Sequence, residues 1–243
     1  MRTLDGVPFD SSAILRGTVP TPGQPTTSLA RPFLEFFAGA ALPEWDSFAR
    51  SIRIMRLRPQ EVLYDVGEEH PYIYLVRRGS VRVGFTDGRG RECLLAFCRP
   101  PDLLASVSAI VPPGLRRLAE PPTGITKMRA TIGVGRTATR ASALEATELE
   151  RLDFRVMERL MGRHASWSIA VYNAVVLHAL VKERRERELL TMTPEERYRQ
   201  FLEDHDDLIG VVPQKDIAGY LGVTPVGLSR IATRVRNESA GLP

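Results

Sequence analysis

One short segment near the C-terminus, Gln214–Val235, holds the side chains best placed for chemistry with a partner. Its apolar residues recur at helical spacing on both sides of a break: Ile217 and Leu221, then Leu228, Ile231 and Val235. Gly222 lies at the break, where a left-handed turn opposes a Cβ, and Thr224-Pro225 supplies a cap and a first helical residue. The segment therefore predicts a helix-turn-helix, which can place its second helix in the major groove of DNA.

The outer face of the second helix carries polar and cationic side chains suited to a duplex. Arg230 can reach the O6 and N7 atoms of guanine in a bidentate contact, and Gln214 suits a backbone phosphate. We expect the DNA-contacting set to be Gln214, Thr224, Val226, Gly227, Ser229, Arg230 and Arg234. A helical hairpin that binds nothing would explain the apolar spacing equally well, but not the cap, the turn and the exposed arginines together.

Composition and motifs narrow the class of protein. The net charge is +4, and the basic residues are 30 Arg and 3 Lys, which reflects either a GC-rich genome or phosphate contact. The two cysteines, Cys93 and Cys98, form no CxxC pair, so we expect no metal site and a reducing cytoplasm. No Ser/His/Asp order, metal spacing or glycine-rich phosphate loop indicates an enzyme. The N-terminus lacks a signal pattern.

The first two-thirds of the chain predict a tail, a helix and then a set of short strands. Residues 1–30 are rich in Pro, Thr, Ser and Gly and indicate a flexible tail, and a helix is expected around Pro32–Arg53. Alternating runs after Ile54, with an Asp87-Gly88 hairpin signal, favour a small barrel or sandwich. A proline-rich loop, 112–124, interrupts it, and strands are expected to resume at Ile125–Val134 and Arg136–Leu144.

A helical period begins at Phe154. The apolar stretch Ile169–Val181 is shorter than the roughly 20 residues that span a bilayer, so it predicts a covered helix and no membrane contact. Its cover is either a second copy of the helix in a dimer or the chain's own barrel. The mixed-charge run Lys182–Glu188 is interpreted as its solvated end. Thr193-Pro194-Glu195-Glu196 forms a capping box that opens a new helix near residue 192.

At this point the sequence resembles the CRP/FNR family, which includes the cyclic-AMP receptor protein and the fumarate-nitrate regulator. The resemblance covers residues 33–236 and is carried by PQKDIAGYLGVTPVGLSRI, by LRPQEVLYDVGEEHPYIYLVRRGSVRV and by TPEERYRQFL. It implies an α+β fold with a flexible tail (1–30), a double-stranded β-helix or jelly-roll sensor (31–153), a dimerisation helix region (154–191) and a winged-helix-like helix-turn-helix domain (192–243). The chain ends soon after its second helix, so any wing is expected to be minimal or absent.

The resemblance also implies a function and partners. Such a protein is a cytoplasmic homodimer that binds a palindromic promoter site in double-stranded DNA under control of a small-molecule effector, and it contacts RNA polymerase. Arg230 matches the family's guanine-reading arginine and Ser229 a serine found in part of the family. Val226 stands where many members have a base-reading glutamate, so a different half-site is expected, with contact to a thymine methyl group.

The effector site departs further from the family's pattern. Arg136-Thr137-Ala138 fits the pair that holds a cyclic nucleotide's phosphate, although Arg129-Ala130-Thr131 is a rival and Arg136 could instead form a surface ion pair. Ala105-Ser106 replaces the Gly-Glu pair that holds the ribose. The expected effector residues are Arg136, Thr137, Ser106, Leu180 and Val181, and a ligand other than a cyclic nucleotide, or none, is favoured.

Two other interpretations remain open. A sensor module with a vestigial helix-turn-helix could act through protein contacts, although it would not need Arg230. A thiol redox switch at Cys93 or Cys98 competes with simple burial of both side chains.

Overall fold

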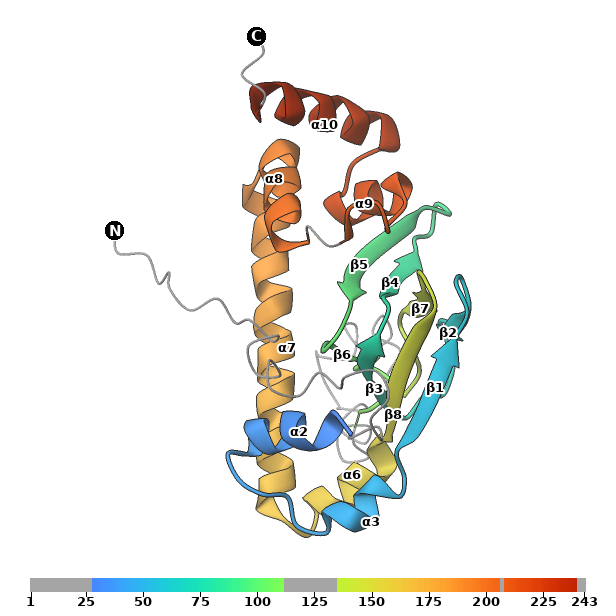
Figure 1. The fold of residues 1–243 in the computed structure, drawn as a ribbon, viewed down its shortest axis with the longest axis vertical. Coiled ribbons are helices and arrows are strands. Elements are labelled where there is room, and N and C mark those ends of the chain that lie inside the picture. The colour runs from blue at the N-terminus through green and yellow to red at the C-terminus, as the bar shows by residue number, and fades with distance from the viewer. Residues whose placement is uncertain (1–27, 112–134, 206–207, 240–243) are drawn as a thin grey trace, which may run out of the picture.

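The computed structural model describes residues 28–111, 135–205 and 208–239 as a β-sandwich beside one long helix, with a smaller helical unit at the far end (Figure 1). The helices are α2 (Ala30–Ala38), α3 (Trp45–Ala49), α6 (Phe154–Met161), α7 (Ala165–Thr191), α8 (Pro194–Asp204), α9 (Gln214–Leu221) and α10 (Pro225–Ser239). The strands are β1 (Arg53–Leu57), β2 (Val62–Tyr64), β3 (Tyr72–Arg78), β4 (Val81–Thr86), β5 (Glu92–Cys98), β6 (Leu103–Leu104), β7 (Arg140–Ala143) and β8 (Thr147–Asp153).

The strands form two antiparallel four-stranded sheets, in the orders β1-β8-β3-β6 and β2-β7-β4-β5. Apolar residues such as Val76, Val81, Ala141 and Leu149 fill the core between them. This arrangement confirms the predicted α+β class with its jelly-roll sheets. The β4–β5 hairpin turns at the predicted place, because Asp87 accepts the backbone N–H groups of Arg89 and Arg91 at 2.8 and 3.0 Å.

The single helix expected around Pro32–Arg53 is wrong. Gly39 ends α2 in the left-handed conformation, with φ 65°, and its N–H donates to the carbonyl of Phe36. A separate short helix, α3, follows, and β1 begins at Arg53. Four aromatic residues of this segment, Phe33, Phe37, Trp45 and Phe48, are buried in the core, whereas Phe36 is exposed. The apolar spacing is therefore explained by two helices as well as by one.

A buried carboxylate anchors the start of α2 to the sandwich. Glu150 of β8 is fully buried and accepts from Ser28 Oγ at 2.8 Å and from the backbone N–H groups of Leu29 and Ala30 at 2.7 and 3.1 Å. Arg77 of β3 pairs with the same carboxylate. Residues 28–30, which the sequence places in the tail, are therefore part of the fold, while residues 1–27 lie outside the described residues.

The predicted helical region 154–191 divides into α6 and α7 at Gly162–His164. On one face of α7, Trp167 and Ala170 are fully buried and Asn173 donates to the carbonyl of Phe37 at 2.8 Å. The apolar side chains on the opposite face are exposed in the single chain: Tyr172, Val176 and Leu180. Val175 and Val181 are exposed beside this face. The rest of the chain therefore covers only part of this helix.

The length and mean hydropathy of α7, 1.2 over an 18-residue window, would also suit a membrane span. That is weak support for one, because the core helix of a folded protein meets the same criterion.

Two expected strands differ from the structure or lie outside the described residues. The expected strand Arg136–Leu144 begins only at Arg140, because residues 135–139 form turns that hydrogen-bond to residues 65–68 and 106–108. The loop 112–124, the strand Ile125–Val134 and the rival triplet Arg129-Ala130-Thr131 lie outside the described residues.

Candidate DNA-binding interface

The helix-turn-helix has the geometry that its sequence predicts. Gly222 adopts φ 70° after α9, and the N–H of Val223 donates to the carbonyl of Ala218 at 3.0 Å. Thr224 then caps α10, because its Oγ1 accepts the N–H of Gly227 at 3.1 Å. The turn is thus fixed by backbone hydrogen bonds and one side-chain cap.

A small apolar core holds the two helices at a fixed angle. Ile217, Ala218 and Leu221 of α9 are buried against Leu228 of α10, and Val235 closes the far end. Ala218 is fully buried, which allows the close crossing that its small size predicts. Ile231, predicted to belong to this core, is only partly buried.

The outer face of α10 is open. Thr224, Val226, Ser229, Arg230 and Arg234 are exposed, and so is Gln214 at the start of α9. Gly227 is the one member of the predicted set that is partly buried, and a Cβ there would lie 3.2 Å from Thr224 Oγ1. Gly227 therefore contributes to the turn, and the other six side chains of the set are exposed.

The two arginines of this face differ in their partners. Within the part of the chain that the structure describes, Arg230 has no ion pair, whereas Arg234 pairs with Glu195 of α8 at 2.9 Å. Hydrogen bonds from Arg199 and Arg234 hold the pKa of the Glu195 carboxyl below its usual value. Arg234 must release Glu195 to contact a phosphate, and Arg230 needs no such exchange.

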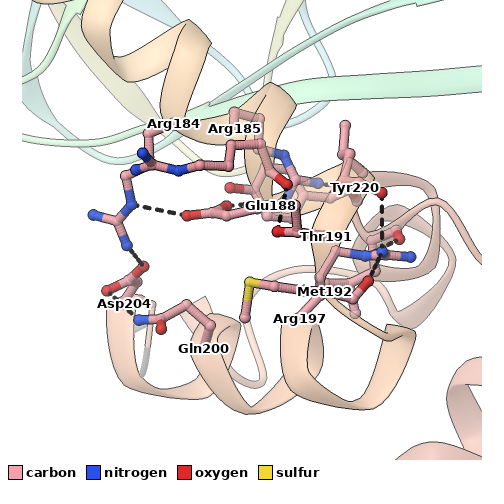
Figure 2. Close-up of polar contacts among 12 residues, drawn as sticks. Arg184, Arg185, Glu188, Thr191, Met192, Arg197, Gln200, Asp204 and Tyr220 are labelled. Atoms are coloured by element: carbon pink, nitrogen blue, oxygen red, sulfur yellow. Dashed lines mark hydrogen bonds and ion pairs between the residues drawn. The ribbon is translucent and has the colours of Figure 1, made fainter. Parts of the chain in front are cut away.

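An arginine cluster joins the helix-turn-helix to the end of α7 (Figure 2). Arg197 of α8 donates to the carbonyls of Met192 at 2.6 Å and Leu221 at 3.1 Å, so one guanidinium binds both the end of α7 and the end of α9. Arg185 lies over the ring of Tyr220 at 4.0 Å and donates to the carbonyl of the same residue. These contacts place α7, α8 and α9 in one connected unit.

Next to Arg185 on α7, Arg184 binds Glu188 at 2.8 Å and Asp204 at 3.1 Å (Figure 2). The sequence predicts that the run Lys182–Glu188 is the solvated end of this helix. Most of the run is exposed, but Arg185 and Glu188 are half-buried where α7 meets α8 and α9. Charge pattern signals only the pairs that Glu188 forms within the helix, because the other acceptors are the carbonyl of Tyr220 and Asp204, which are distant in sequence.

The predicted effector residues lie in two groups. Ser106 and Thr137 are buried and close together, because Ser106 Oγ accepts the N–H of Ala138 at 3.2 Å. Thr137 Oγ1 donates to the carbonyl of Asp65 and accepts the N–H of Glu68 at 2.9 Å. Both hydroxyls therefore hold loops together, and a ligand would have to share them.

The remaining effector candidates are exposed. Arg136 donates to the carbonyl of Gly67 at 2.7 Å and lies 3.7 Å from Glu69, the surface ion pair that the sequence offered as an alternative. Leu180 and Val181 belong to the exposed stripe of α7. A broad cleft of about 1810 Å³ between β5, α7 and α8 is lined by Val181 but by none of the other four.

Two histidines, His178 and His205, line the same cleft. Burial lowers the pKa of His178, which lies near Lys182, and lowers that of His205 to about 4. The ring of His205 packs among Phe97, Phe201 and Tyr220. Cys98 is buried at the cleft wall, where burial raises the pKa of its thiol, so the neutral thiol is favoured there.

Comparison with solved structures identifies the fold. The chain is similar to FixK2 from Bradyrhizobium japonicum, with TM-score 0.61, 20% identity and coverage of 77% of this chain and 86% of that one. It is similar to the c-di-GMP-responsive global regulator CLP of Xanthomonas campestris, with TM-score 0.58, 12% identity and coverage of 80% and 91%.

A third similar structure, a regulator from Eubacterium rectale assigned to the CRP/FNR family, has TM-score 0.59, 13% identity and coverage of 81% and 88%. The chain therefore has the fold of CRP/FNR-type transcription regulators. At these identities the likeness establishes the fold alone. No protein-family model and no curated protein matches the sequence.

Proposed function

We propose that the chain is a DNA-binding transcription regulator and not an enzyme. The observation that carries the proposal is the open face of α10, where Arg230 is exposed and free of ion pairs among the described residues. The cap at Thr224 and the left-handed Gly222 hold this face at the end of the molecule, away from the sandwich (Figure 1). Arg230 would read guanine, Val226 would touch a thymine methyl group, and Gln214 would bind phosphate.

The regulator would act as a homodimer on a two-fold symmetric site. The apolar stripe of α7 supports this, because Tyr172, Val176 and Leu180 are exposed in the single chain, and such a stripe is stable in water only when it is covered. A second copy of the same helix offers the complementary face. Two recognition helices would then have to lie about 34 Å apart to enter successive major grooves.

Control by a small-molecule effector, contact with RNA polymerase and a cytoplasmic location belong to the same proposal. The effector would bind in the sandwich near Ser106, Arg136 and Thr137. A cyclic nucleotide is disfavoured, because Ala105-Ser106 offers no carboxylate for a ribose hydroxyl and because Thr137 Oγ1 is already bonded to the backbone.

Selection of bound DNA from a random duplex pool tests the proposal. Wild-type protein should enrich a two-fold symmetric consensus, and Arg230→Ala should weaken or relax it at one position of each half-site. Arg236→Ala is the matched control, since Arg236 is an exposed arginine on another face of α10. Failure to enrich any sequence, both alone and with cell extract as a source of effector, would contradict DNA binding and favour a sensor with a vestigial helix-turn-helix.

A further inference from the structure

The β4–β5 hairpin of the sandwich holds the first helix of the helix-turn-helix through an ion pair. Arg82 of β4 donates to both carboxylate oxygens of Asp216 in α9, each at 3.1 Å. The Asp216 side chain is 3% exposed and that of Arg82 is 17% exposed, so the pair is largely shielded from solvent. The Nε of Arg82 also donates to Ser142 Oγ of β7 at 3.0 Å, which fixes the guanidinium on the sheet.

Apolar contacts surround this pair. The α9 helix packs against β5 (Figure 1), where a Cβ on Gly219 would be in ordinary van der Waals contact with the carbonyl oxygen of Glu92, at 3.6 Å. Phe97 of β5 contacts the ring of Tyr220 with centroids 5.3 Å apart. The helix-turn-helix is thus attached to the sandwich by a defined surface in addition to its connection through α7.

The burial of Asp216 shows what the ion pair contributes. An apolar contact could hold α9 against the sheet with about equal stability, but it would allow α9 to shift along the strands. A buried carboxylate without its guanidinium partner carries a large free-energy cost, so α9 is stable only where Asp216 meets Arg82. The pair therefore fixes one placement of α9 on β4 and β5.

The attached arrangement leaves the proposed DNA-contacting face unobstructed. Gln214 and Lys215, in the same turn of α9 as Asp216, are exposed, and so are Ser229 and Arg230 of α10. Arg82 also neutralises a carboxylate that would otherwise repel a phosphate close to Gln214. Both points favour an arrangement that is competent to bind DNA.

We propose that Arg82 and Asp216 are positioning residues that fasten the helix-turn-helix to its own sensor in the orientation that binds DNA. The inference rests on the proposed function for its second half, but the fastening itself does not depend on DNA. Release of the pair would give α9 and α10 freedom that DNA must then remove, so affinity would fall.

The test uses full-length Arg82→Gln, Asp216→Asn and the double variant, with Arg140→Gln as the matched control. Arg140 lies on the neighbouring strand β7, and its ion pair is with Asp65 at the surface and not with a residue of the helix-turn-helix. Hydrogen exchange of the α9 amides measures the fastening without DNA. Titration of the selected duplex measures its effect on binding.

Each single variant should speed exchange in α9 and weaken DNA binding about tenfold, the size expected for loss of one charge-assisted bond. The double variant should be no worse than Arg82→Gln, because each single change already removes the contact between Arg82 and Asp216. The swapped variant, Arg82→Asp with Asp216→Arg, should recover part of both effects. The control should match wild type in both measurements.

The outcomes separate the two halves of the proposal. Unchanged exchange in α9 would overturn the fastening, whatever happens to DNA binding. Faster exchange with unchanged or tighter DNA binding would overturn the role of the pair in positioning, while the proposed function stands. If wild-type protein selects no DNA, the proposed function fails and the exchange data still decide whether the pair fastens α9.

Discussion

Replacement of Glu150 by glutamine should destabilise the protein far more than the small change in shape suggests. One oxygen of Glu150 accepts from Leu29 and Arg77, and the other accepts from Ser28 and Ala30. Glutamine removes the negative charge from the acceptor of the first two bonds, which costs about 1 kcal/mol each, and places an NH₂ opposite the Ala30 N–H, which costs about 1–3 kcal/mol more. The expected loss is about 3–5 kcal/mol, a large share of the roughly 5–15 kcal/mol that stabilises a typical domain.

Urea unfolding followed by circular dichroism measures this loss. Glu148→Gln is the matched control, because Glu148 is the neighbouring partner of Arg77 but is 23% exposed and also binds the surface residue Arg56 at 3.0 Å. The control should lose less than about 1 kcal/mol. Equal losses in the two variants, or a loss below about 1 kcal/mol for Glu150→Gln, would refute the view that this buried carboxylate anchors α2.

Three further predictions concern the helices. Leu180→Glu should weaken self-association at least about 100-fold in sedimentation velocity, because two copies of a buried leucine are lost across a two-fold axis. Glu186→Gln should not, because Glu186 is exposed on the side of α7 that lines the cleft. A wild-type monomer at micromolar concentration would contradict the dimer. Arg197→Met should lower the free energy of unfolding by about 2 kcal/mol, since it leaves the carbonyls of Met192 and Leu221 without their donor, and no loss would contradict the role of this cap. Because the pKa of His205 is about 4 in the fold and about 6.5 when unfolded, the unfolded state binds more protons between these values. Stability should therefore fall by about 2 kcal/mol as pH drops from 6.5 to 5, and His205→Gln should remove that fall; an unaltered pH profile in the variant would contradict the assignment.

Local signals made the helix-turn-helix predictable. The positive φ of Gly222, the cap at Thr224 and the burial of Leu228 each depend on residues within a few positions, and the sequence indicates all three. The capping box at Thr193 and Glu196 is confirmed for the same reason. The sandwich followed from alternation and from the Asp87-Gly88 turn.

Contacts between distant segments were not predictable. The partners of Arg82, Arg185 and Arg197 lie 134, 35 and 24 residues away, and two of these arginines donate to backbone carbonyls, which leave no mark in the sequence. The break at Gly39 was missed because an apolar spacing continues across it. The expected DNA-contacting and effector residues remain predictions, apart from their placement and exposure.

The most direct test of DNA reading is a titration of the selected duplex in which each guanine of the half-site is replaced in turn by 7-deazaguanine. Removal of the N7 acceptor should weaken wild-type binding about 5- to 100-fold at one position, because a bidentate arginine contact is worth about 1–3 kcal/mol. Arg230→Ala should bind the normal and the modified duplex equally. Equal sensitivity of wild type and variant at every guanine would contradict the assignment of Arg230 as the residue that reads the site.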